Sequence, residues 1–308
     1  NTTLVSNSPT SGSVTDLRSW TPYLQLKTSP VPNSSVQGQL LEVPSTSSIT
    51  NGALFEIYNN KQRAYRAFGI PLKDGTIIPQ FTDDIDVTGT VTGTNANLFT
   101  TSCSWCTHSL FSWDEANSQW SPYASGNTIT NIPVGTGILT FFRGARGNGL
   151  GDTSEVANEQ ILDFKGDLQV GSKTVTLSNS GSGSLGGYNL IGNPFPCTID
   201  LREVFESNNN NILSRFYIYD AIARRYNEWD STGGGGRAPT RNGTSDFASA
   251  GNRNKTKFLA PGAAAFFVTK SNPSALSVTF NESHKVSAGK SVTKHFSTGV
   301  QEEETTDC

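Results

Sequence analysis

The chain has 308 residues, of which 34% are hydrophobic and 16% are charged, and its formal net charge is −3. This length allows one large or two medium domains with a buried core. The low fraction of charged residues excludes a strongly charged disordered chain, and the small negative net charge gives no reason to expect nucleic acid or an anionic membrane as a partner. No apolar run reaches the roughly 18 residues of a membrane-spanning helix, so we expect no span.

Residues 1–50 are rich in Ser, Thr and Pro and contain only short apolar stretches, at 23–26 and 40–43. Such a pattern predicts short strands separated by turns. An unpaired strand can join the sheet edge of another molecule. We therefore hypothesise that this segment pairs with a neighbouring subunit and builds a fibre or surface layer by strand addition.

From residue 51 onward, apolar and aromatic residues come in short bursts bounded by Gly, Asn, Asp, Ser or Pro. Bursts of this length, several with alternating polar residues, predict β-strands. One short helix is predicted after an N-cap at Asp200, because Leu201, Val204 and Phe205 share one helical face. The predicted class is all-β. The bursts occupy residues 54–58, 138–142, 173–177, 216–219, 265–268 and 275–280.

An internal repeat organises these strands. In the stretches 110–120 and 216–226, an aromatic strand ends in Asp and an aromatic residue returns soon after it. We predict two equivalent hairpins in which Asp starts the turn and the aromatic residues pair across the strands. The repeat continues on both sides, since residues 65–71 match 188–194 and residues 132–139 match 259–266.

The repeat predicts two tandem, related β-sandwich-like modules with short helical turns, at residues 51–180 and 181–296. The second copy carries an inserted loop at 231–255, which contains four consecutive glycines. Residues 297–308 form an acidic tail, interpreted as a truncated end. The chain contains no Met, so we expect a matured protein or an internal piece of a longer one.

The segment at residues 187–201, GYNLIGNPFPCTIDL, interrupts an apolar run with Gly192, Asn193 and two prolines. Gly permits backbone conformations that other residues avoid and Pro removes a ladder hydrogen bond, so the combination ends or bulges a strand. The same Gly-x-Pro break occurs at Gly69 and Pro71. Because both copies carry it, we interpret the break as a device of shape and not as a catalytic loop.

The same segment resembles the "GWNLVGNPYP…IDW" motif of Bacteroidota extracellular proteins that are commonly exported by the type IX secretion route. Residues 216–220 are similar to the family's "IYxWD", residues 259–268 to its "IxPGQGFFV", and residues 278–286 to its "IxFxxxxRV". The resemblance implies a secreted or surface-anchored, adhesin-like or structural protein and no defined enzyme. Cys197 and the Ala263–Ala265 stretch depart from the family pattern.

The four cysteines are Cys103, Cys106, Cys197 and Cys308. The CxxC at Cys103 lacks the second CxxC of a zinc site and the helix N-terminus of a thioredoxin-type redox pair. In an exported protein, disulfides are the expected state, with metal binding, redox chemistry and free thiols as alternatives. A local bridge within the CxxC would leave Cys197 and Cys308 to pair with each other or with neighbouring chains.

No nucleophile, zinc-protease or phosphate-loop motif is present, and His108, His284 and His295 lie in no catalytic pattern. His284 is predicted to be a solvated turn residue. We therefore expect no enzyme and no cofactor. Carboxylates that could hold calcium match no defined calcium loop; they are Asp83, Asp84, Asp86, Glu155, Glu159 and Asp163.

Aromatic residues around the two hairpins raise glycan binding as an alternative, because exposed aromatic rings stack on sugars. Trp105 and Trp229 have no repeat partner and are the candidates for exposed rings, together with Tyr123. The aromatic residues that do repeat are expected to pair as core.

The favoured function is thus a non-enzymatic structural or adhesive protein at the cell surface or outside the cell. Its expected partners are further copies of itself, other surface proteins or glycans. The alternatives are a glycan-binding module and an accessory region of a secreted hydrolase.

Overall fold

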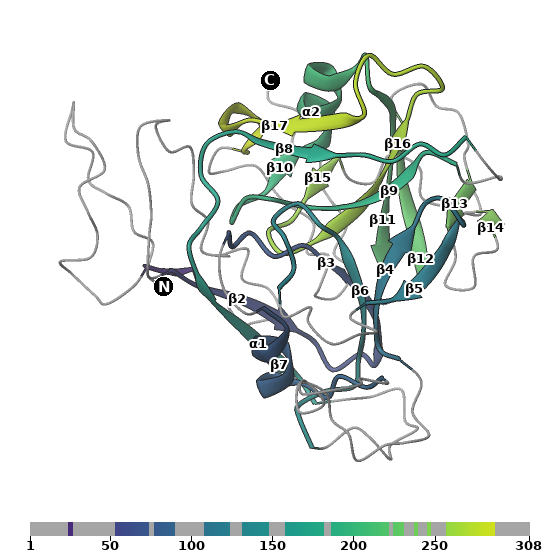
Figure 1. The fold of residues 1–308 in the computed structure, drawn as a ribbon. Coiled ribbons are helices and arrows are strands. Elements are labelled where there is room, and N and C mark those ends of the chain that lie inside the picture. Colours follow the sequence, from purple (N-terminus) through teal and green to yellow (C-terminus); the bar gives the residue numbers. More distant parts are fainter. Residues whose placement is uncertain are drawn as a thin grey trace, which may run out of the picture.

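The computed structural model of the chain consists mainly of β-strands with two short α-helices, which confirms the all-β class (Figure 1). The structure describes residues 24–26, 53–73, 77–89, 108–123, 131–147, 158–181, 186–221, 224–230, 237–239, 245–247 and 257–286. Within these residues, no helix has the length and apolar character that crossing a bilayer requires.

The elements follow one another in a regular order. They are β1 (Leu24–Leu26), β2 (Ala53–Asn59), β3 (Ala64–Phe68), α1 (Ile77–Asp84), β4 (Leu110–Asp114), β5 (Gln119–Pro122), β6 (Ile138–Phe142), β7 (Gln160–Gly166), β8 (Lys173–Thr176), β9 (Tyr188–Gly192), β10 (Ile199–Asp200), α2 (Leu201–Asn208), β11 (Ile212–Asp220), β12 (Arg225–Asp230), β13 (Arg237–Pro239), β14 (Ser245–Phe247), β15 (Phe258–Leu259), β16 (Ala264–Thr269), β17 (Ser277–Phe280) and the 3₁₀ helix η4 (Glu282–His284).

Two four-stranded sheets have the same strand order. The first is β3-β6-β4-β5 and the second, read in the same direction, is β9-β16-β11-β12. Their registers also correspond, because Trp113 pairs with Trp120 in the first hairpin as Tyr219 pairs with Tyr226 in the second. The predicted hairpins and their aromatic cross-strand pairs are therefore confirmed.

Each sheet is covered on its outer face by a helix and a strand pair. Figure 1 shows α1 beside β2 and β7 at one end of the molecule, and α2 beside β8 and β17 at the other. Helix α2 begins where the sequence predicts, and the Asp200 side chain accepts a hydrogen bond from the Arg202 amide as an N-cap. Strand β8 belongs to the first predicted module, residues 51–180, but pairs with β17 of the second. The module boundary at residue 180 stays a prediction.

The inner faces of the two sheets meet in an aromatic layer. The ring of Phe266 lies 5.3 Å from Trp113 and 5.7 Å from Trp120, in edge-to-face geometry that favours aromatic pairs. This layer consists of Ala67, Leu139, Tyr188, Leu190, Tyr217, Ala264, Phe266 and Val268, with partly buried Tyr65, Phe111, Trp113, Trp120, Tyr219 and Tyr226.

The two repeats contact each other reciprocally through their Gly-x-Pro breaks. The Gly69 amide donates to the Gly262 carbonyl at 3.0 Å, and the Gly192 amide donates to the Gly135 carbonyl at the same distance. These four glycines are the equivalent positions of the repeat, so each copy gives the other the contact that it receives. This is the pattern of a two-fold interface built within one chain.

Glu115, in the turn of the first hairpin, ties the two repeats together at a second place. Its side chain is 6% exposed and accepts hydrogen bonds from the amide and hydroxyl of Ser180, at 3.0 Å each, and from the Gly187 amide. A buried carboxylate is retained only when such donors satisfy it. The first hairpin is therefore anchored to the loop that precedes β9.

Strand β1 lies parallel to β2 of its own chain, with Leu24 opposite Ala53 and Leu26 opposite Phe55. Leu26 is buried in the core. This pairing counts against donation of β1 to a neighbouring subunit. The rest of residues 1–50, and the acidic tail at 297–308, lie outside the described residues. Of the inserted loop at 231–255, the structure describes the short antiparallel pair β13–β14.

We predict that Gly69→Ala destabilises the protein by about 3 kcal/mol or more, because the added Cβ would meet backbone atoms, which cannot move aside as a flexible side chain can. A Cβ at Gly69 would overlap the backbone of Gly192, and one at Gly192 would lie 2.6 Å from the Gly69 Cα. Urea unfolding measures the change.

The matched control is Gly181→Ala, where φ is +65° and no atom lies within 4 Å of the added Cβ. That variant carries only the backbone cost of about 1 kcal/mol. Equal losses in the two variants would show that the contact between the repeats is not tightly packed.

Candidate functional site

The Gly-Asn-Pro break after β9 is interpreted from the sequence as a device of shape and not as a catalytic loop. Its Asn193 is fully buried, and the side-chain Nδ2 donates to the carbonyls of Cys197 at 2.8 Å and of residues 259 and 260 at 3.1 Å each. The Oδ1 accepts from the Phe195 amide at 3.0 Å. Both N–H donors of the Asn193 side chain are thus bonded to backbone carbonyls, which favours the structural interpretation of the motif.

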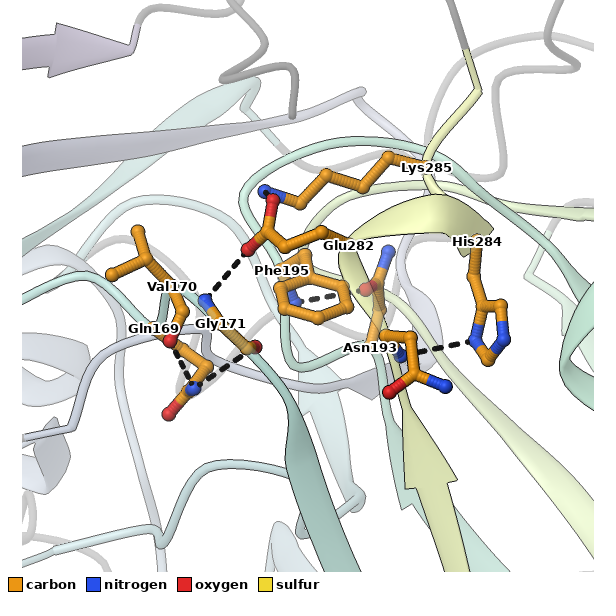
Figure 2. A network of polar contacts seen from close by, with 9 residues as sticks. Gln169, Val170, Gly171, Asn193, Phe195, Glu282, His284 and Lys285 are labelled. Carbon is orange, nitrogen blue, oxygen red and sulfur yellow. Dashed lines mark hydrogen bonds and ion pairs between the residues drawn. The ribbon is translucent and has the colours of Figure 1, made fainter. Parts of the chain in front are cut away.

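A charged pair lies over this break. Figure 2 shows Lys285 reaching over the ring of Phe195, with its Nζ 4.7 Å from the ring centre and 2.6 Å from the Glu282 Oε2. The Glu282 Oε1 accepts from the Gly171 amide at 2.7 Å. The Lys285 side chain is 2% exposed, so the ammonium depends on this carboxylate and this aromatic face for compensation.

His284 lies beside this pair and is buried, at 2% exposure, so the expectation of a solvated turn residue is wrong. Its Nδ1 accepts from the Asn281 amide at 3.2 Å, and its Nε2 bonds the Ser207 hydroxyl at 3.0 Å. Burial lowers the pKa of His284, although Asp200 opposes the shift. The ring works as a neutral hydrogen-bonding link between η4 and α2.

Cys197 is a free, fully buried thiol, and burial raises its pKa to about 12. The expectation that Cys197 joins a disulfide is therefore wrong for this structure, since the thiol is free and lies inside the core. A thiol with such a pKa is not a nucleophile at neutral pH. Cys103, Cys106 and Cys308 lie outside the described residues.

The glycan candidates occupy different environments. Trp229 is 8% exposed and stacks on Phe216 with 5.5 Å between ring centres, so the expectation of an exposed ring is wrong for Trp229. Its place on β12 directs the indole to the core side of the second sheet. Tyr123 is partly buried, and its hydroxyl donates to the Asn131 carbonyl at 3.0 Å. Trp105 lies outside the described residues.

Two of the calcium candidates, Asp84 and Asp86, accept hydrogen bonds from backbone and side-chain amide groups. The Asp84 carboxylate accepts from the Asp163 amide at 2.9 Å and from the Gln160 side chain at 3.0 Å, and burial raises its pKa to about 6. Asp86 accepts from the Gly147 amide at 3.0 Å. Across the part of the chain that the structure describes, no three His, Cys, Asp or Glu side chains converge as metal ligands. Glu155 lies outside that part.

Comparison with known proteins places the chain in one family. Residues 88–307 match a family described as a domain of unknown function, DUF8693, and the chain belongs to it. No curated protein and no solved structure matches the chain. The match begins after β2, β3 and α1, although β2 pairs with β7 and Gly69 contacts Gly192.

We predict that Asn193→Ala destabilises the protein by about 3 kcal/mol, because it leaves several buried backbone groups without partners at about 1–3 kcal/mol for each unsatisfied group. Urea unfolding compares it with Asn117→Ala, in the exposed turn of the first hairpin, where the loss should stay within about 0.5 kcal/mol. A small effect at Asn193 would contradict its role in holding the break.

We predict that His284 makes the protein less stable as pH falls below about 6.5, its unfolded value. The folded pKa is lower, so the unfolded state binds more protons in this window, and protonation removes the acceptor for the Asn281 amide. The free energy of unfolding, measured from pH 7.5 to 5, should fall less steeply in His284→Gln than in the unmodified protein. His108→Gln is the comparison: burial lowers the pKa of His108 as well, so this variant loses the part of the slope due to His108 and keeps the part due to His284.

Proposed function

We propose that this chain is a non-enzymatic structural or adhesive part of a protein exported to the cell surface, of the kind that Bacteroidota send through the type IX route. The supporting observation is that residues of the motif carrying the resemblance are used inside the scaffold. Asn193 holds the break after β9, Gly262 receives the Gly69 amide, and Phe266 fills the layer between the sheets.

The way in which the two repeats are joined also supports a mechanical role. They share backbone hydrogen bonds through the four glycines, a carboxylate anchor at Glu115 and one continuous core. Separating them would break these contacts together and expose the aromatic layer. A unit that resists separation is suited to display or to bear load outside the cell, where chaperones and ATP are absent.

The side chains around the break after β9 support the same proposal. Asn193, Cys197 and His284 are all buried, and their polar atoms face other groups of the protein. A catalytic group must reach a substrate, so residues in this state act on the fold and not on a ligand. The pairing of β1 with its own chain directs the proposed self-association to surfaces other than this strand.

Immunogold electron microscopy of intact cells of the source bacterium tests the proposal. An antibody raised against the chain should label the outer surface, and a strain lacking the gene should lose the label. The same strain should also attach less well to surfaces or to other cells, or show an altered surface layer, and recover on complementation. Label confined to the cell interior would overturn the proposal, as would an unchanged surface and unchanged attachment.

A further inference from the structure

Arg66, on β3, is a buried cation that the proposed function does not use. Its side chain is 1% exposed, and only one of its nitrogens is engaged in hydrogen bonds. Nη2 donates to the Gln62 carbonyl at 2.7 Å, to the Asn60 Oδ1 at 2.8 Å and to the Asn60 carbonyl at 3.3 Å. These bonds hold the connection between β2 and β3.

The rest of the guanidinium has no hydrogen-bond partner. Nε and Nη1 are buried and unbonded, and the group lies over the Phe142 ring at 4.8 Å. Among the described residues, no carboxylate forms an ion pair with Arg66, and the groups that favour its charged form are the hydroxyls of Tyr58 and Tyr219, which are neutral at pH 7. Burial lowers its pKa to about 10, so the group still carries its charge at neutral pH. A buried, unpaired charge of this kind is costly.

Thr140 supplies a second unbonded polar group next to this cation. It lies directly opposite Arg66 in the pairing of β3 with β6, and residues opposite each other project from the same face of a sheet. Its side chain is fully buried, and its Oγ1 has no hydrogen-bond partner. The two side chains therefore project from the same face of the β3–β6 pair, and both carry buried donors that are not used.

The second repeat shows that the fold does not require this arrangement. The pair equivalent to Arg66 and Thr140 is Asn189 and Phe267, which lie opposite each other in β9 and β16. The Asn189 side chain holds its preceding connection with bonds to the Ser178 backbone at 2.7 and 2.9 Å, and it is neutral. Holding the connection thus needs an amide only, and the charge and the extra donors of Arg66 are specific to the first repeat.

We propose that Arg66 and Thr140 form an internal binding site for a small monovalent anion of the halide class, such as chloride. The anion would accept hydrogen bonds from the free N–H groups of Arg66 and from the hydroxyl of Thr140, and it would balance the buried charge. The unbonded atoms are enclosed by protein, which suits a monatomic ion and excludes bulky anions. An ordered water would fill some of the hydrogen bonds but would leave the charge uncompensated.

Thermal unfolding of the full chain tests this site with chloride, bromide and gluconate as sodium salts at equal ionic strength. A ligand that binds only the folded state raises the Tm in a saturable way. We expect chloride and bromide to raise the Tm above its value in gluconate, and Arg66→Gln and Thr140→Val to lose that difference. Thr140→Val keeps the shape of the side chain and tests the site independently if Arg66→Gln does not fold.

Arg202→Gln is the matched control, since Arg202 is an exposed arginine paired with Glu206 on α2, and this variant should keep the halide effect. A crystal grown in bromide should show an anomalous scattering peak within contact distance of Arg66. The proposal is overturned by equal Tm values in the three salts, by a halide effect that both variants keep, or by a water at Arg66 with no anomalous peak.

Discussion

The backbones of the two repeats approach each other where Gly69 faces Gly192, and much of the structure depends on this contact. A side chain at either position would collide with the opposite backbone, so the close approach requires glycine. The approach brings the amides of both glycines to the carbonyls of Gly262 and Gly135. It also sets the separation at which Phe266 fits between the aromatic residues of the facing sheet.

Buried polar groups then fix the connections around this centre. Glu115 anchors the first hairpin to the loop before β9, Asn193 holds the break after that strand, and the pair of Lys285 and Glu282 covers it. Each of these groups fixes one arrangement of its connection, because a buried polar group is stable only with its hydrogen-bond partners in place. Arg66 differs from them in having free donors, and that difference distinguishes it as a candidate site.

The sequence was a good guide wherever the pattern was local or repeated. The hairpins followed from Asp114 and Asp220 with their returning aromatic residues, and α2 followed from the spacing after Asp200. Helix α1 was missed because Pro79 lies within it and argues against a helix, although proline is tolerated in the first helical turn. Its place in the chain, equivalent to that of α2 in the second repeat, was the signal that could have found it.

By itself, the sequence determined the all-β class, the two copies and the glycine–proline break, since period, turn residues and repetition are properties of neighbouring positions. Only the tertiary structure decided that Trp229, Cys197 and His284 are buried and that the copies meet reciprocally. Burial of a single side chain depends on which distant strands cover it, and no local pattern carries that information. The unpaired donors of Arg66 became visible for the same reason, once β6 had placed Thr140 opposite it.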